Sequence, residues 1–204
     1  MERNLDAKYY VNSYDKEKNI YSSKENTLLL VIDEQPKLMN TMENGEQTIL
    51  NTLVLINAFK EYGMPILATE QYPKGLGRSD DRLLAEIEEN NIFAKSIFDA
   101  AIPEVIEYIR ENKITNVVLT GAEGHICVYQ TVRTLRDLGL NVFLAEDAVS
   151  SYSEELKNTA LINMRDMGAM VVNTEMLLFD IARDSKDAHF KVISNLVKEI
   201  RARD

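Results

Sequence analysis

The chain has few of the residue types that build disulfides and metal centres. It contains one cysteine, Cys127, and two histidines among 204 residues. A single cysteine excludes an internal disulfide, a cysteine-rich zinc site and dithiol redox chemistry within the chain. Two histidines are too few for a histidine-rich metal centre. We therefore expect no metal and no cofactor.

Positive charge and long apolar runs are also scarce. The formal net charge is -10, whereas nucleic-acid binding needs a surplus of lysine and arginine on one face. No apolar run approaches the roughly 20 residues that cross a bilayer, and the polar start lacks the apolar core of a signal peptide. We expect a cytoplasmic protein with neither a nucleic-acid nor a membrane partner. A free thiol agrees with a reducing compartment.

What the chain does contain is an alternation of short apolar runs with longer helical patterns. Residues 1–26 are polar and tyrosine-bearing, which predicts an N-terminal arm, and residues 27–204 form one domain. Strands are predicted at 27–33, 65–69, 92–95, 116–120, 141–145 and 169–172. Helices are predicted at 46–62, 80–88, 102–111, from Cys127 to 138, from a Ser151 and Glu154 capping box to 167, at 175–183 and at 187–202. This order predicts an α/β fold, a three-layer doubly wound sandwich around a mostly parallel sheet.

Three chemically active side chains follow predicted strands. Asp33 ends the first strand, Lys95 ends the third, and Cys127 lies just beyond the fourth. Parallel sheets bind ligands beyond the C-terminal ends of their strands, so these side chains point to one pocket. There Asp33 would take the thiol proton, and Lys95 would stabilise the thiolate and keep Asp33 anionic. Cys127 would then attack an electrophilic carbon. The alternative is structural, because a lone cysteine often packs as a small hydrophobe and an acid often caps a loop.

Several segments, in order along the chain, resemble the isochorismatase-like cysteine hydrolases, which include nicotinamidases. The matching segments are LVIDEQ at 30–35, TEQYPKGLG at 69–77, AKSIF at 94–98, GAEGHICV at 121–128 and EDAVSS at 146–151. The similarity spans about residues 27 to 180. Any one of these motifs alone would be weak evidence for the family, whereas the occurrence of several motifs in the right order is fairly specific.

The resemblance implies a catalytic triad of Asp33, Lys95 and Cys127 on a six-stranded sheet of order 3-2-1-4-5-6. It also implies a cis peptide between Ala122 and Glu123, which turns the amides of Glu123 and Cys127 toward one point as an oxyanion hole. The expected reaction is hydrolysis of the C–N amide bond of a small molecule through a thioester. For such an enzyme we expect a thiol pKa well below the free value of about 8.5.

Four further residues are candidates for substrate binding: Gln35, Glu70, Tyr72 and Phe98. Each could equally serve loop packing or subunit contact, because pockets use few polar groups. Nicotinamidases carry an Asp-x-His metal site where this chain reads Glu70-Gln71-Tyr72, so we expect neither nicotinamide as substrate nor a metal. We also expect a homo-oligomer, to which the arm and the last helix could contribute.

Other classes remain as alternatives. The first is a catalytically silent scaffold or binding module of the same fold. A phospho-acceptor receiver is disfavoured, because it needs an aspartate where this chain has Lys95. A dinucleotide-binding domain is disfavoured as well, because residues 33–37 contain no glycine.

Overall fold

A computed structural model of the protein describes residues 24–203. Most of the expected arm lies outside the described residues, and its last three residues form a 3-10 turn, Lys24–Asn26. The core is a six-stranded sheet of order β3-β2-β1-β4-β5-β6, in which every neighbouring pair is parallel. The strands are β1 Thr27–Ile32, β2 Ile66–Gln71, β3 Ile92–Lys95, β4 Asn116–Gly121, β5 Asn141–Val149 and β6 Met170–Val172. The predicted fold class and strand order are therefore confirmed.

Continuous apolar sequence places β1 and β4 at the centre of the sheet. Every residue of these two strands is buried, which is typical of parallel strands covered by helices on both faces. They pair along their whole length, from Thr27 beside Asn116 to Ile32 beside Gly121. The pairing brings the C-terminal ends of the two strands to the same edge of the sheet.

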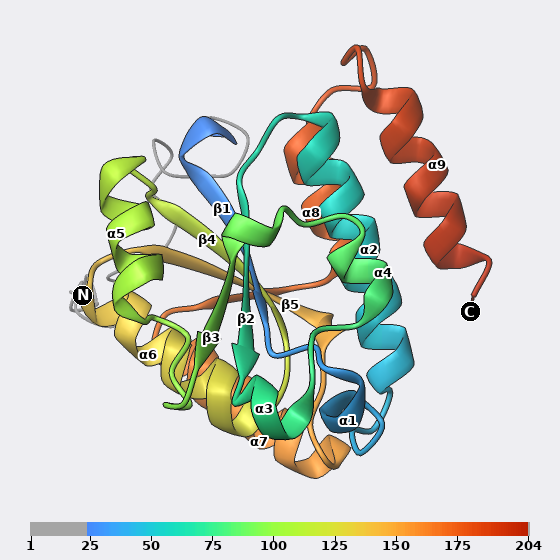
Figure 1. The fold of residues 1–204 in the computed structure, drawn as a ribbon. Helices are drawn as coiled ribbons and strands as arrows, with labels where there is room; N and C mark the ends of the chain where they lie inside the picture. Colours follow the sequence, from blue (N-terminus) through green and yellow to red (C-terminus); the bar gives the residue numbers. More distant parts are fainter. Residues whose placement is uncertain (1–23, 204) are drawn as a thin grey trace, which may run out of the picture.

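Helices cover both faces of the sheet (Figure 1). On one face, alternate β1 side chains pack with α5 Pro103–Glu111, α6 Tyr129–Asp137 and α7 Glu154–Asp166. The opposite β1 side chains pack with α2 Gly45–Glu61 and α8 Thr174–Ala182. The two-residue alternation of a strand thus divides the apolar residues of β1 between two cores.

The last helix, α9 Phe190–Arg201, does not contact the sheet in this way. Its apolar stripe, Ile193, Leu196, Val197 and Ile200, packs on Val54 of α2 and Leu178 of α8, in a separate cluster. Figure 1 shows α9 outside these two helices. It therefore adds a further layer on one side of the sandwich.

Several element boundaries differ from the prediction. The helix expected over 80–88 is a single turn, α4 Asp81–Leu84, and it is followed by a 3-10 turn, Glu89–Asn91. β5 continues to Val149 through a shift of register against β4. Ser153, not Ser151, caps α7, with its Oγ accepting the Leu156 N–H at 3.3 Å. Two short helices were not predicted, α1 Pro36–Met39 and α3 Pro73–Leu76.

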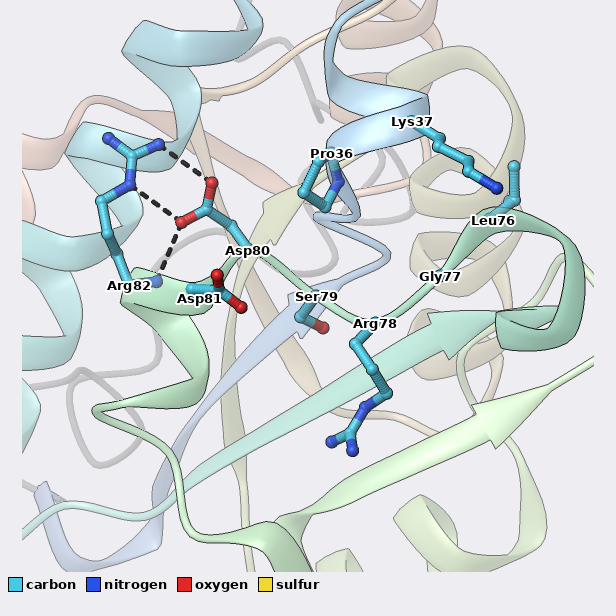
Figure 2. A pocket seen from close by; sticks show the side chains of 9 residues that line it. All are labelled: Pro36, Lys37, Leu76, Gly77, Arg78, Ser79, Asp80, Asp81 and Arg82. Atoms are coloured by element: carbon cyan, nitrogen blue, oxygen red, sulfur yellow. Dashed lines mark hydrogen bonds and ion pairs between the residues drawn. The ribbon is translucent and has the colours of Figure 1, made fainter.

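The segment between β2 and α4 borders a shallow surface hollow of about 520 Å³ (Figure 2). Its cationic side chains are already paired: Arg82 with Asp80 and Glu46, Arg78 with Glu70 and Glu89, and Lys37 Nζ with the Gly75 carbonyl. The lining of this hollow does not include Asp33, Lys95 or Cys127. Within residues 24–203, no helix has the length and apolar character that crossing a bilayer requires.

Candidate active site

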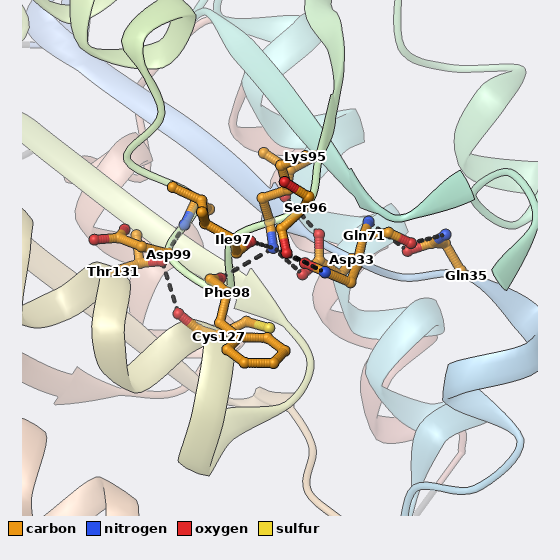
Figure 3. A network of polar contacts seen from close by, with 12 residues as sticks. Asp33, Gln35, Gln71, Lys95, Ser96, Ile97, Phe98, Asp99, Cys127 and Thr131 are labelled. Carbon is orange, nitrogen blue, oxygen red and sulfur yellow. Dashed lines mark hydrogen bonds and ion pairs between the residues drawn. The ribbon is translucent and has the colours of Figure 1, made fainter. Parts of the chain in front are cut away.

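The three side chains singled out at strand ends lie together at the C-terminal edge of the sheet. Lys95 Nζ is 2.6 Å from Asp33 Oδ2, and the Cys127 thiol lies close enough to Asp33 for that carboxylate to raise the thiol pKa. All three residues are buried, with 6% or less of their surface exposed. Figure 3 shows them converging from three segments of the chain. An acid, a cation and a thiol thus form one cluster.

The backbone around Asp33 fixes the direction of its carboxylate. Asp33 follows β1 in a left-handed conformation with φ 54°, which aspartate tolerates better than most residues. Its N–H donates to the Thr69 carbonyl at 3.0 Å, and Thr69 Oγ1 donates back to Asp33 Oδ1 at 2.8 Å. One carboxylate oxygen is therefore bound by Thr69 and the other by Lys95.

Lys95 ends β3, and its ammonium lies among oxygen acceptors. Besides its ion pair with Asp33, Nζ donates to Gln71 Oε1 at 2.7 Å and to the carbonyls of Phe98 at 3.0 Å and Ile97 at 3.2 Å. Gln71 is the register partner of Lys95 across β2 and β3, so the parallel pairing itself places this acceptor. The ammonium charge is consequently well compensated despite its burial.

The loop that carries Cys127 has an unusual backbone. The Ala122–Glu123 peptide bond is cis, the conformation that the resemblance implied for it, and Gly124–Val128 form a π-helical turn. Gly124 N–H donates to the Ser150 carbonyl at 2.8 Å, and a side chain on Gly124 would lie 2.9 Å from Val149 and Ser151. A larger residue at position 124 would therefore require the side chains of Val149 and Ser151 at the end of β5 to shift.

Burial and mutual charge control the protonation of the cluster. Burial raises the pKa of Asp33, and the Lys95 ammonium opposes that rise. Burial, together with the Asp33 carboxylate, raises the pKa of the Cys127 thiol to about 12, against the smaller opposing effects of Lys95 and of a hydrogen bond from the Glu123 backbone. The expectation of a lowered thiol pKa is wrong for this structure, because Cys127 is buried and faces a carboxylate. The resting group is a thiol with a base beside it.

Two of the candidate substrate-binding residues make extensive contacts within the protein. Gln35 is fully buried; its Nε2 donates to the carbonyls of Gln71 at 3.0 Å and Gly77 at 2.6 Å, and its Oε1 accepts the Gln71 N–H at 2.8 Å. Glu70 Oε1 accepts from Arg78 Nε at 2.8 Å and from Ser79 through both its N–H and its hydroxyl. These contacts hold the segment after β2 against the end of β1.

The other two candidates are exposed. Tyr72 and Phe98 have 58% and 52% of their surface accessible, and the neighbouring Ile97 is similarly exposed. Tyr72 directly follows Gln71, and the Ile97 and Phe98 carbonyls bind the Lys95 ammonium. Apolar side chains therefore project from the same segments that hold the buried cation.

The sequence interpretation missed several polar partners of the cluster. Gln71, which accepts from Lys95, ends β2, so the criterion that identified Lys95 could have found it. Thr69, which donates to Asp33, lies within the same strand. Glu34, which directly follows Asp33, was also not singled out. Thr131 lies four residues after Cys127, so helical spacing could have found it. His125, set aside as a base for Cys127, has its Nε2 3.9 Å from Glu123 Oε2.

Glu34 is the most unusual of these residues, because it is a buried carboxyl without a cationic partner at hydrogen-bond distance. Its Oε1 accepts from Thr52 at 2.6 Å and from Thr120 at 3.2 Å, and its Oε2 has no hydrogen-bond partner. Burial raises its pKa to about 8. Glu34 is therefore predominantly uncharged at neutral pH.

Comparison with known proteins agrees with this fold. A family model described as the Isochorismatase domain matches residues 27–176, more than half of the chain. The chain belongs to the isochorismatase family. This membership supports an enzyme of the hydrolase class and does not fit a receiver or a dinucleotide-binding domain.

Relatives in the isochorismatase family extend across most of the chain. Isochorismatase family protein 1A of Dictyostelium discoideum is 34% identical, over 88% of this chain and 89% of its own. Isochorismatase domain-containing protein 2 of Xenopus laevis is 30% identical, over 85% and 84%. The similarity therefore covers nearly the whole length of each protein.

Solved structures show the same architecture. A structure described as MAR1 ribonuclease from Caenorhabditis elegans has a TM-score of 0.81 and 34% identity, covering 85% of this chain and 90% of that one. The ycaC gene product of Escherichia coli, described as an octameric hydrolase of unknown specificity, has a TM-score of 0.77 and covers 89% and 96%. At 18% identity, the second similarity shows the fold alone.

Proposed function

We propose that the protein is a cysteine hydrolase that cleaves the C–N amide bond of a small molecule through a thioester acyl-enzyme. The observation that carries this proposal is the burial of the Cys127 thiol beside an Asp33 carboxylate that is itself paired with Lys95. A nucleophile beside a base, with the base held by a third group, is the arrangement that covalent catalysis requires.

In the first half of the reaction, Cys127 Sγ bonds to the amide carbonyl carbon while its proton passes to the Asp33 carboxylate. The carbonyl π pair moves onto oxygen, where the backbone amides of Glu123 and Cys127 would stabilise it as an oxyanion hole, each worth about 3 kcal/mol of barrier. When the C–N bond breaks, the leaving nitrogen takes the proton from Asp33. Ammonia or an amine departs, and a thioester remains on Cys127.

In the second half, water attacks the thioester carbon and gives a proton to Asp33. The C–S bond breaks as the oxyanion collapses, and the proton returns to sulfur, which releases a carboxylic acid and restores the thiol. The raised pKa of Asp33 suits this cycle, because a more basic carboxylate takes the proton of a buried thiol more readily. Lys95 keeps Asp33 ionised between these transfers.

The charges near the site favour a small, uncharged amide. Asp33 and Lys95 neutralise each other, as do Glu70 and Arg78, and exposed Tyr72 and Phe98 offer apolar surface. We propose Tyr72 and Phe98 as substrate contacts. Gln35 and Glu70 act instead by holding the segment after β2, since their hydrogen bonds are made within the protein.

A ribonuclease activity is a rival, because one structural relative is described as a ribonuclease. The net charge of -10 disfavours it, since RNA binding depends on neutralising phosphates with lysine and arginine. A catalytically silent scaffold is the other rival. It would leave unexplained why a carboxylate and an ammonium are buried beside the sole thiol, an arrangement that structural stability does not require.

Ammonia release from a panel of small amides, compared between the native protein and Cys127→Ala, tests the proposal. We expect turnover of at least one amide by the native protein and its loss by about a thousandfold or more in the variant, with unchanged melting. Labelled RNA in a parallel assay should remain intact. Cleavage of RNA without any amide turnover would support the ribonuclease. Absence of both activities would support the catalytically silent scaffold.

We further propose that residues 27–204 act as one cytoplasmic domain within a homo-oligomer. The composition and free thiol support a reducing compartment, and the described octameric state of the Escherichia coli relative is a precedent for assembly of this fold. Light scattering after size-exclusion chromatography measures the assembly directly. A mass of 23.3 kDa would mean a monomer and contradict it.

A further inference from the structure

One buried hydroxyl joins the backbone of Cys127 to the loop that follows β3. Thr131 lies in the first turn of α6 and has no exposed surface. Its Oγ1 donates to the Cys127 carbonyl at 2.7 Å and accepts the N–H of Ala100 at 2.8 Å. Figure 3 shows Thr131 between these two parts of the chain.

The loop that Thr131 binds is the one that holds the Lys95 ammonium. Two of its carbonyls, those of Ile97 and Phe98, accept hydrogen bonds from Lys95 Nζ. Ala100 lies two residues beyond Phe98, so a shift of Ala100 would displace the acceptors of the ammonium. The Thr131 hydroxyl therefore connects the backbone of Cys127 to the loop whose carbonyls bind the Lys95 ammonium.

A second contact ties the same loop to α6 without touching Cys127. Thr134 Oγ1 donates to Asp99 Oδ2 at 2.5 Å, and Asp99 Oδ1 accepts the N–H of Ala101 at 2.8 Å. Thr134 is one helical turn after Thr131 and is only partly buried. This contact provides a matched control, because it anchors the same loop to α6 but, unlike Thr131, makes no hydrogen bond to the Cys127 backbone.

The bond from Thr131 to Cys127 alone would not indicate a role beyond the helix. Threonine hydroxyls commonly donate to the carbonyl four residues earlier in a helix. The bond from Ala100 is different, because it comes from another segment and satisfies a buried N–H that would otherwise cost free energy. The combination of the two bonds makes Thr131 a bridge between two segments of the site.

We propose that Thr131 is a positioning residue that sets the distance between the Cys127 thiol and the Asp33–Lys95 ion pair. This inference rests on the proposed function, in which Cys127 is the nucleophile and Asp33 its base. Thr131 does not touch the reacting atoms; it acts through the backbone of Cys127 and the carbonyls around Lys95. Its loss should therefore slow proton transfer and leave substrate affinity nearly unchanged.

Three variants separate this role from a structural one. Thr131→Val keeps the shape and removes the hydroxyl, Thr131→Ser keeps the hydroxyl, and Thr134→Val removes only the second contact. Two measurements are made on each: kcat and KM for the amide found by the panel, and the rate of Cys127 alkylation by iodoacetamide against pH. The alkylation profile needs no substrate and stays informative if no amide is hydrolysed.

For Thr131→Val we expect kcat to fall by about tenfold or more, KM to stay within about twofold and the alkylation profile to shift along the pH axis. Thr131→Ser and Thr134→Val should stay within about threefold of the native kcat, with unshifted profiles. If Thr131→Val does not fold, Thr131→Ala is measured in its place with the same expectation.

Equal behaviour of Thr131→Val and Thr134→Val in both measurements would overturn the positioning role. So would a Thr131→Ser variant as impaired as Thr131→Val, because the hydroxyl would then not be the cause. Failure of the proposed function gives a different result, namely full turnover by Cys127→Ala or no amide turnover by the native protein. In that case the alkylation profiles alone decide whether Thr131 positions the thiol.

Discussion

The Asp33 carboxylate and the Lys95 ammonium are both buried, and each is tolerated in the folded protein because the other is present. Lys95→Met leaves the carboxylate without its counter-charge, so we expect the free energy of unfolding to fall by about 3 kcal/mol at pH 8. Adding Asp33→Asn should recover most of that loss, although the double variant will be inactive. Urea unfolding of the native protein, Lys95→Met and the double variant measures the loss and its recovery. A double variant no more stable than Lys95→Met would contradict the claim that each charge is tolerated because of the other.

Glu34 should make stability depend on pH. Its carboxyl titrates near 8 in the folded protein, against a reference value of 4.5, so between these values the folded protein keeps a proton that the unfolded chain releases. Stability from this group is complete below about pH 4.5 and is lost as pH rises toward 8. Glu34→Gln keeps an acceptor for Thr52 and Thr120 and cannot ionise.

Urea unfolding of the native protein and Glu34→Gln at pH 5.5 and 8.5 tests this expectation. The native protein should lose about 2 to 3 kcal/mol more than the variant between the two pH values. Other titrating groups, including the nearby Asp80 and Arg82, are common to both proteins and cancel in the comparison. Equal losses would mean that Glu34 does not keep its proton.

Part of the site could be predicted from residues alone. The rule that parallel strands direct ligands to their C-terminal ends identified Asp33, Lys95 and Cys127, which the structure brings together. The thiol pKa could not be predicted in the same way, because its direction depends on burial and on a carboxylate from a distant segment. The hydrogen bonds of Gln35 and Glu70 could not be predicted from the sequence either, because their partners belong to a loop whose path the sequence does not specify.

At the scale of elements, the approach of β1 to the end of β4 depends on Gly121. This residue has φ 114°, and a Cβ on it would lie 2.0 Å from the Ile32 carbonyl oxygen. Gly121→Ala should therefore destabilise the protein by at least about 3 kcal/mol or prevent folding, because backbone must move. Gly139, with φ 80° after α6, is the control, because a Cβ there meets nothing within 4 Å.

For Gly139→Ala only the cost of the left-handed backbone applies, about 1 kcal/mol. Thermal and urea unfolding of the two variants give the comparison. Equal destabilisation would show that backbone conformation, and not the contact with β1, explains the glycine at 121. Crowding at this point would also displace Asp33, which directly follows Ile32.

Long elements were easier to predict than short ones. The strands and the long helices follow from apolar periodicity, because burial on one or both faces shapes their sequences. The single turn of α4 and the short helices α1 and α3 contain too few residues for a helical repeat of apolar residues to be recognised. The extension of β5 to Val149 depends on its irregular pairing with β4, which no local pattern records.

At the scale of the whole molecule, the alternation of strands and helices predicted the layers but not the strand order. That order came from the resemblance to isochorismatase-like hydrolases, because alternation alone allows several doubly wound topologies. The place of α9 was also not predictable: its apolar stripe fits a sheet face equally well, but it packs on α2 and α8. Only the packed structure distinguishes these arrangements.

The central claim is that Cys127 forms a covalent acyl intermediate. Intact-protein mass spectrometry during rapid-quench turnover of the active amide measures it directly. We predict a transient mass increase equal to the acyl group less the thiol hydrogen that it replaces, located on the Cys127 peptide, discharged by hydroxylamine and absent from Cys127→Ala. Turnover of the amide at the native rate by Cys127→Ala, or an acyl group on another residue, would contradict the claim.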